Sequence, residues 1–108
     1  MDNTDWTITN KPYDLRERWF LFACLIVRVV EFLHRRGPIA IALSPQLLKS
    51  GTGANYEEAD DGSSPKDARA KKRVVLRELK ETNFRLRVLQ NRGYLTDVQQ
   101  PVIDESAE

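Results

Sequence analysis

A long apolar stripe near the start of the chain constrains its fold most. Six large apolar side chains recur at alternating intervals of four and three residues: Leu15, Trp19, Phe22, Ile26, Val29 and Leu33. This spacing is typical of a helix packed in a bundle or a coiled coil. Asp14 and Glu17 resemble a capping box at its start, and Gly37-Pro38 ends it. We therefore predict a helix over about 14–36.

The same helix also carries apolar residues outside this stripe, namely Phe20, Leu21, Leu25, Val27 and Phe32. A helix that is apolar around most of its circumference is buried on more than one side. A chain of 108 residues has few other elements to cover it, so the pattern predicts self-association through this helix. Cys24 lies in the same run and is expected to be a small core residue.

A second helix is predicted over 44–60, with Ser44 as its cap and Pro45 at its first position. Its inner stripe changes from leucines to the small residues Gly51, Gly53 and Ala54. Because a glycine inside a helix costs about 1 kcal/mol relative to alanine, we expect close packing against a neighbouring helix at this point.

A third helix is predicted over 64–92, from Ser64-Pro65 to the stop at Gly93. Its apolar stripe is Ala68, Val75, Leu79, Thr82, Leu86 and Leu89. A short fourth helix follows over 98–108, since Pro101 restricts where it begins. We expect so short a helix to contribute little to the core, so that either the native chain is longer or a partner subunit fills the gap.

Taken together, these patterns predict an all-α fold, an up-and-down antiparallel four-helix bundle. Residues 1–12 are expected to form an irregular N-terminal arm, and residues 13–108 the helical domain. With one cysteine and one histidine (His34), neither an internal disulfide nor a Cys/His metal cluster is expected. No cofactor is predicted.

The cellular location of the protein is predicted from its apolar segments and its first residues. The longest apolar run, from Trp19 to Val30, is twelve residues interrupted by Arg28, against about 20 for a membrane span. The first residues lack the pattern of a secretory signal. We expect a soluble, cytoplasmic protein with no membrane contact.

The net charge of +1 conceals a basic segment. Residues 64–93 contain ten Lys and Arg against three Asp and Glu, whereas 57–61 and the segment from Asp97 onward are acidic. The candidate nucleic-acid-binding residues are Arg69, Lys71, Lys72, Arg73, Arg77 and Lys80. Cations of this kind bind phosphates in a salt-dependent, largely sequence-independent way. The alternative is a solvated helix face, because Phe84 alone does not make the aromatic platform typical of single-strand binding.

A second candidate is a polar network of Asn55, Glu58, Glu78 and Glu81, which converges if the second and third helices are neighbours. Paired carboxylates can perform acid–base chemistry or hold a cation. No nucleophile or second histidine accompanies them, so we interpret them as structural, with Arg16 or Arg18 as counter-charge. Gly51-Thr-Gly53 lacks the context of a phosphate loop. The helix dipole explains the position of His34, because a cation near the end of the first helix interacts favourably with it.

Three stretches together resemble one family: Tyr13-Asp-Leu-Arg-Glu-Arg18, Gln46–Ser50 with Gly53–Ala59, and Glu78 with Glu81-Thr82. They are similar to the four-helix-bundle proteins encoded by intervening sequences of bacterial 23S rRNA genes. Those resemble in fold the accessory variability protein of diversity-generating retroelements. The chain departs from the family at Ala68, at Arg85 and in the length of the fourth helix.

The resemblance implies a ring-like homopentamer without enzymatic activity. For the retroelement relatives it also implies binding to nucleic acid and to a reverse transcriptase. We therefore expect a non-enzymatic oligomeric adaptor that binds RNA or DNA backbone through the basic third helix. The alternative is a structural or protein-recruiting scaffold that binds no nucleic acid.

Overall fold

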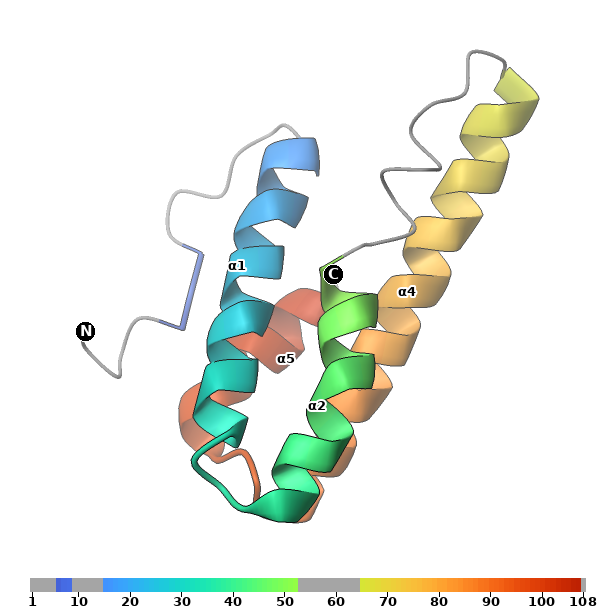
Figure 1. Ribbon diagram of the computed structural model, residues 1–108. Coiled ribbons are helices and arrows are strands. Elements are labelled where there is room, and N and C mark those ends of the chain that lie inside the picture. The colour runs from blue at the N-terminus through green and yellow to red at the C-terminus, as the bar shows by residue number, and fades with distance from the viewer. Residues whose placement is uncertain (1–5, 9–14, 53–64, 108) are drawn as a thin grey trace.

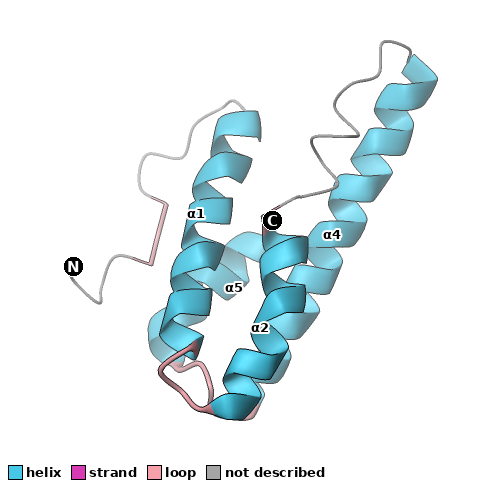
Figure 2. Ribbon diagram, in the orientation of Figure 1, coloured by secondary structure: helices cyan, strands magenta, loops and turns pink. Residues whose placement is uncertain are grey.

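The computed structural model describes residues 6–8, 15–52 and 65–107, and these residues form an all-α fold (Figures 1 and 2). Helix α1 spans Leu15–Leu33, α2 spans Pro38–Gly51 and α4 spans Pro65–Asn91. A 3₁₀ turn, η1 (Asp97–Gln99), leads directly into the short helix α5 (Gln100–Ser106). The predicted all-α class is confirmed.

The helices pack in chain order, and the last one closes the bundle. Contacts join α1 to α2, α2 to α4 and α4 to α5, and α5 also contacts α1. In Figure 1, α1, α2 and α4 alternate in direction, with α5 behind α1 and α2. This is the predicted up-and-down arrangement with a short fourth helix.

The predicted core stripes are confirmed wherever their side chains are described. In α1 the stripe is buried from Trp19 to Leu33, and Leu25 is buried beside it. In α4, Thr82, Leu86 and Leu89 are buried, while Val75 and Leu79 are half-buried. The side chains of Leu15 and Ala68 lie outside the described part.

The predicted start of the second helix at Ser44 is wrong, because α2 already begins at Pro38. Gly37, with φ 108°, turns the chain, and Pro38 takes the first helical position. Pro45 lies inside the helix, where it has no N–H to bond the carbonyl of Ile41. The buried Ser44 hydroxyl donates to that carbonyl at 2.8 Å, which explains how the helix continues through the proline.

Close packing at Gly51 is confirmed. A Cβ atom added there would lie 2.6 Å from Cγ2 and 2.7 Å from Cγ1 of Ile26 on α1. These are branched atoms next to the Ile26 backbone and have little freedom to move. Glycine thus allows α1 and α2 to approach each other at the end of α2. Gly53 and Ala54 lie outside the described residues.

The last helix begins in the predicted region, with Thr96 and Gln99 forming a capping box. The backbone N–H of Thr96 donates to Gln99 Oε1 at 2.8 Å. The expectation that this helix contributes little to the core is wrong, because Val102 and Ile103 are buried together with Leu95. The helix is short, but its apolar face turns inward between α1 and α4.

Two apolar residues of the predicted N-terminal arm belong to the core. Trp6 and Ile8 are buried, and the segment 6–8 is not helical. The Trp6 ring packs edge-on against Phe32 at 6.2 Å between centroids, and the Arg28 guanidinium lies 4.4 Å from the Trp6 centroid. Part of the off-stripe apolar surface of α1 is therefore covered by the chain itself.

The prediction that Cys24 is a core residue is wrong, because this cysteine is exposed. It lies on the side of α1 away from the buried stripe. An apolar run cannot by itself distinguish positions that face the core from positions that face outward.

Candidate nucleic-acid interface

The exposed side of α4 carries a row of cations, which we call the basic stripe: Arg69, Arg73, Arg77, Lys80 and Arg87. All five side chains are exposed. At 3.6 residues per turn they lie within a sector of roughly 80° around the helix axis. The buried residues Thr82, Leu86 and Leu89 lie on the opposite side. The outward side of α4 is thus mainly basic, and it also carries the exposed apolar side chains of Leu76 and Phe84.

The basic stripe is long and its charges are unpaired within the described part. From Arg69 to Arg87 it extends over about 27 Å at the α-helical rise. None of its five cations forms an ion pair with another described residue, whereas Arg18 pairs with Glu105. Unpaired cations in a row on one face produce a positive field along α4.

Four of the six predicted binding residues belong to this stripe: Arg69, Arg73, Arg77 and Lys80. The side chains of Lys71 and Lys72 lie outside the described part. Sequence reasoning missed Arg87 as a site residue and gave Phe84 no role, although the spacing from Lys80 places both on the same side of the helix. Phe84 is 57% exposed.

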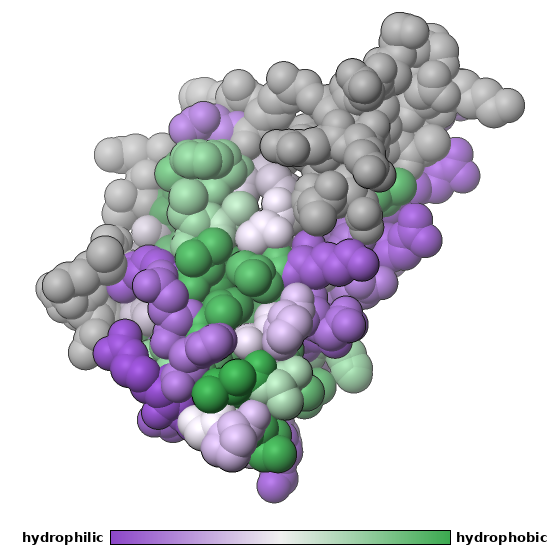
Figure 3. All heavy atoms as spheres, in the orientation of Figure 1, coloured by the Kyte–Doolittle hydropathy of each residue, from purple (hydrophilic) through white to green (hydrophobic). Residues whose placement is uncertain are grey.

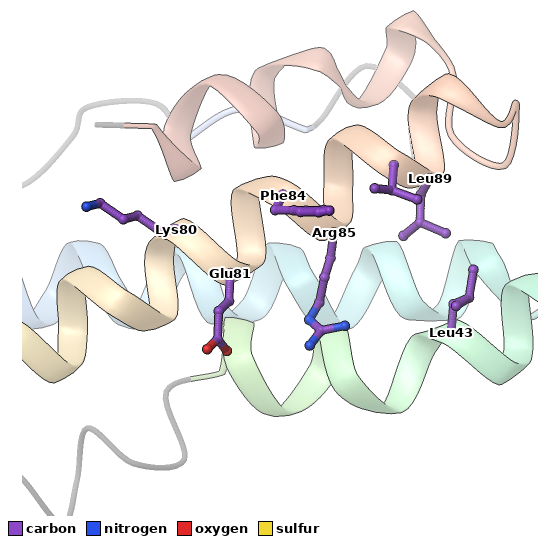
Figure 4. A pocket seen from close by; sticks show the side chains of 7 residues that line it. Leu43, Lys80, Glu81, Phe84, Arg85 and Leu89 are labelled. Carbon is purple, nitrogen blue, oxygen red and sulfur yellow. The ribbon is translucent and has the colours of Figure 1, made fainter.

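An apolar groove lies beside the stripe, between α2 and α4 (Figure 4). We call it the α2–α4 groove; its volume is about 490 Å³, and it is lined by Leu43, Lys80, Glu81, Phe84, Arg85, Val88 and Leu89. Figure 4 shows Glu81 and Arg85 extending from α4 toward α2, while Leu43 extends from α2 toward α4 near Leu89. Phe84 and Val88 also border a second hollow, of about 390 Å³, with Arg87, Asn91 and Arg92.

Arg85 contributes an unsatisfied donor to this region. Its Nε atom is buried and has no hydrogen-bond partner among the described residues. A buried N–H without an acceptor is costly unless a ligand or water supplies one. The Nε–H of Arg85 is thus a buried donor without an acceptor among the described residues, while the guanidinium as a whole lines the groove.

The predicted polar network is described only in part. Asn55 and Glu58 lie outside the described residues, Glu78 is buried and Glu81 is exposed. A polar hollow of about 300 Å³ brings Glu78 and Glu81 beside Lys49 and Ser50 of α2. Thr82 Oγ1 lies 2.9 Å from Ser50 Oγ and 2.8 Å from the carbonyl of Glu78. The contact between Thr82 and Ser50 joins α2 to α4, whereas the bond to the Glu78 carbonyl lies within α4. Neither contact uses a side chain of the predicted network, whose structural role stays a prediction.

The proposed counter-charge Arg18 forms a bidentate contact with Glu105 of α5. The side chain of Arg16 is outside the described part. Within the described ranges, no group of three or more His, Cys, Asp or Glu side chains is placed to hold a metal ion. His34 is exposed just after α1, with Nε2 3.4 Å from the Ser44 hydroxyl.

A second surface is apolar. On α1, Phe20 (59%) and Val27 (42%) are exposed, and on α2 so are Ile41 (40%) and Leu48 (37%). Figure 3 shows apolar side chains gathered over α1 and α2 on one side of the molecule. We call this surface, with the exposed Cys24, the α1–α2 apolar face. Exposed apolar side chains gathered in this way mark interaction surfaces.

Across the described residues, no helix is both long enough and apolar enough to span a bilayer. Comparison with known proteins finds no match to any family model, curated protein or solved structure. The fold and the surfaces thus define a compact four-helix all-α protein with one basic helix face and one apolar face.

Proposed function

We propose that this protein is a non-enzymatic oligomeric adaptor, which binds the phosphate backbone of RNA or DNA through the basic stripe of α4. One observation carries the proposal. Five exposed cations occupy one side of a single helix, directly opposite its buried side, without ion pairs to other described residues.

The chemistry of phosphate binding supports this assignment. Lysine and arginine that neutralise phosphates release condensed counterions, which favours binding at low salt and weakens it as salt rises. Arginine, which supplies four of the five cations, also presents a planar fork that bonds phosphate oxygens in pairs. A straight row of such groups fits an extended polyanion better than a compact anion.

Self-association is the second part of the proposal. The α1–α2 apolar face exposes two large side chains on each helix, and covering it with another copy removes this surface from water. The resemblance to the intervening-sequence proteins favours a ring-like homopentamer, and with it a bacterial, cytoplasmic protein. In such a ring the basic stripe is repeated in every subunit, and a reverse transcriptase is a further candidate partner.

The alternative function is a protein-recruiting scaffold that binds no nucleic acid. The α2–α4 groove favours it, because its apolar lining of Leu43, Val88 and Leu89 also suits a partner helix. The two functions differ in their salt dependence, since apolar docking weakens little as salt rises whereas phosphate binding weakens steeply.

The test is direct binding of labelled RNA and DNA oligonucleotides by fluorescence anisotropy. The variant combines Arg73→Gln, Arg77→Gln and Lys80→Gln, which removes three charges from exposed positions and keeps good helix formers. We expect its affinity to fall at least tenfold at low salt, with helicity and oligomer mass unchanged.

A matched pair of single variants controls for net charge. Arg77→Gln lies in the basic stripe, whereas Arg35→Gln changes an exposed arginine in the turn after α1. We expect only Arg77→Gln to weaken binding. Equal binding by the triple variant and the unmodified protein would refute the basic stripe as the binding site. Absence of salt-dependent binding by the unmodified protein would refute the nucleic-acid function and leave the scaffold function.

A further inference from the structure

Phe84 is an exposed aromatic ring in the middle of a row of cations. Along α4 it lies four residues after Lys80 and three residues before Arg87, so one cation is about one turn away on either side. Its side chain is 57% exposed, and it borders both the α2–α4 groove and the neighbouring hollow. The ring therefore does not belong to the core of the single chain.

We propose that α4 binds single-stranded nucleic acid, with one unpaired base stacked on the ring of Phe84 and the flanking phosphates on Lys80 and Arg87. This inference rests on the proposed function and specifies its ligand. In a duplex the bases are already stacked and paired, so an exposed ring on a convex helix does not reach a base face. An unpaired base in a single strand exposes its face without the free energy needed to unpair and unstack a duplex.

The charges around the groove define how the strand lies. Glu81 lines the groove beside Phe84, and its carboxylate repels phosphates from that side. Lys80 lies at the edge of the groove, and the other cations of the basic stripe lie outside it, so the backbone follows the stripe and the base turns toward the groove. Leu43 and Val88 then cover apolar edges of the base.

Arg85 supplies a donor for the same base. Its side chain lines the groove, and Figure 4 shows the guanidinium extending from α4 toward α2, where its terminal N–H groups are available as donors. A base carbonyl or ring nitrogen in the groove provides the acceptor. Aromatic stacking, phosphate pairing and this donor act together on a single nucleotide.

The experiment compares a labelled oligothymidylate with a duplex of equal length, at several matched salt concentrations. Phe84→Ala removes the ring, and Val98→Ala is the control, because Val98 is also exposed (47%) but lies in η1, outside the basic stripe, the α2–α4 groove and the α1–α2 apolar face. We expect Phe84→Ala to weaken single-strand binding about fivefold to a hundredfold, the range for loss of one base–aromatic stack. Phe84→Trp should retain binding, and Val98→Ala should change it little.

Duplex binding and oligomer mass complete the test. We expect the unmodified protein to bind the single strand more tightly than the duplex, and Phe84→Ala to leave duplex binding and oligomer mass unchanged. Single-strand binding unaffected by Phe84→Ala would overturn the inference. So would a loss of oligomer mass in this variant, since the ring would then be a contact between copies.

The outcomes also separate this inference from the proposed function. If the single-stranded and the duplex oligonucleotide bind equally, in a salt-dependent way and without an effect of Phe84→Ala, the basic stripe still binds the phosphate backbone and only the stacking site is refuted. If the unmodified protein binds neither oligonucleotide, both proposals fail.

Discussion

Arg18 and Glu105 lie 87 positions apart and join α1 to α5 through two hydrogen bonds. Arg18 Nε donates to Oε1 at 2.7 Å, and Nη2 donates to Oε2 at 3.2 Å. The Glu105 side chain is 8% exposed and that of Arg18 is 30% exposed. This bidentate contact, together with the buried Val102 and Ile103, makes the short last helix an integral part of the bundle.

Replacing Glu105 with glutamine should destabilise the fold. The substitution keeps the shape but removes the charge and one acceptor opposite a partly buried guanidinium, at a cost of about 1–3 kcal/mol. Urea unfolding monitored by circular dichroism measures this change. Glu31→Gln on the exposed side of α1 is the control, and a midpoint equal to that control would show that the contact contributes nothing.

Adding a methyl group at Gly51 should push α1 and α2 apart. The new Cβ would lie 2.6 Å from Ile26 Cγ2, and overpacking of this kind costs about 1–3 kcal/mol. The higher helix propensity of alanine offsets less than about 1 kcal/mol of this loss, because position 51 is at the end of the helix. We expect Gly51→Ala to lower the free energy of unfolding by about 1–2 kcal/mol.

The same substitution in an Ile26→Ala background provides the control, because the clashing atoms are then absent. Gly51→Ala should cost nothing there, even though Ile26→Ala itself destabilises the core by about 2–5 kcal/mol. If Gly51→Ala lowered the free energy of unfolding equally in both backgrounds, the loss would not arise from a clash with Ile26.

Cys24 reports on the α1–α2 apolar face. It is exposed in the single chain, on the same helix as the exposed Phe20 and Val27. If copies associate through this face, the thiol should react slowly with a maleimide at high protein concentration and faster on dilution. Phe20→Glu should lower the mass measured by light scattering and remove this protection. A reaction rate independent of concentration would contradict association through this face.

The helices that sequence periodicity predicted best are those with one continuous buried stripe. In α1 and α4 the intervals of three and four residues locate the buried side, and the same count places Arg87 with Lys80 on the exposed side. Periodicity could not locate the start of α2, because Gly37-Pro38 and Ser44-Pro45 are both plausible starts. Only the bond from Ser44 Oγ to Ile41 O shows that the second proline is accommodated inside the helix.

Contacts between distant segments could not be predicted from local pattern. Nothing in the spacing of Trp6 indicates that it packs against Phe32 and Arg28, and nothing in the spacing of Glu105 indicates Arg18. The exposure of Cys24, by contrast, agrees with the spacing in α1, because this residue lies opposite the stripe residues Phe22 and Ile26. For the candidate site, charge and helical spacing place four exposed cations on one side of α4, namely Arg69, Arg73, Arg77 and Lys80. Their binding of nucleic acid stays a prediction.

The most direct test of the central claim is the salt dependence of single-strand binding, compared between the unmodified protein and the variant Arg73→Gln, Arg77→Gln, Lys80→Gln. If each of these cations contacts one phosphate, the slope of log K against log salt should become shallower by about 0.7 per contact, or about 2 in total. That result would assign phosphate binding to the basic stripe of α4. An identical slope and affinity in the two proteins would contradict it.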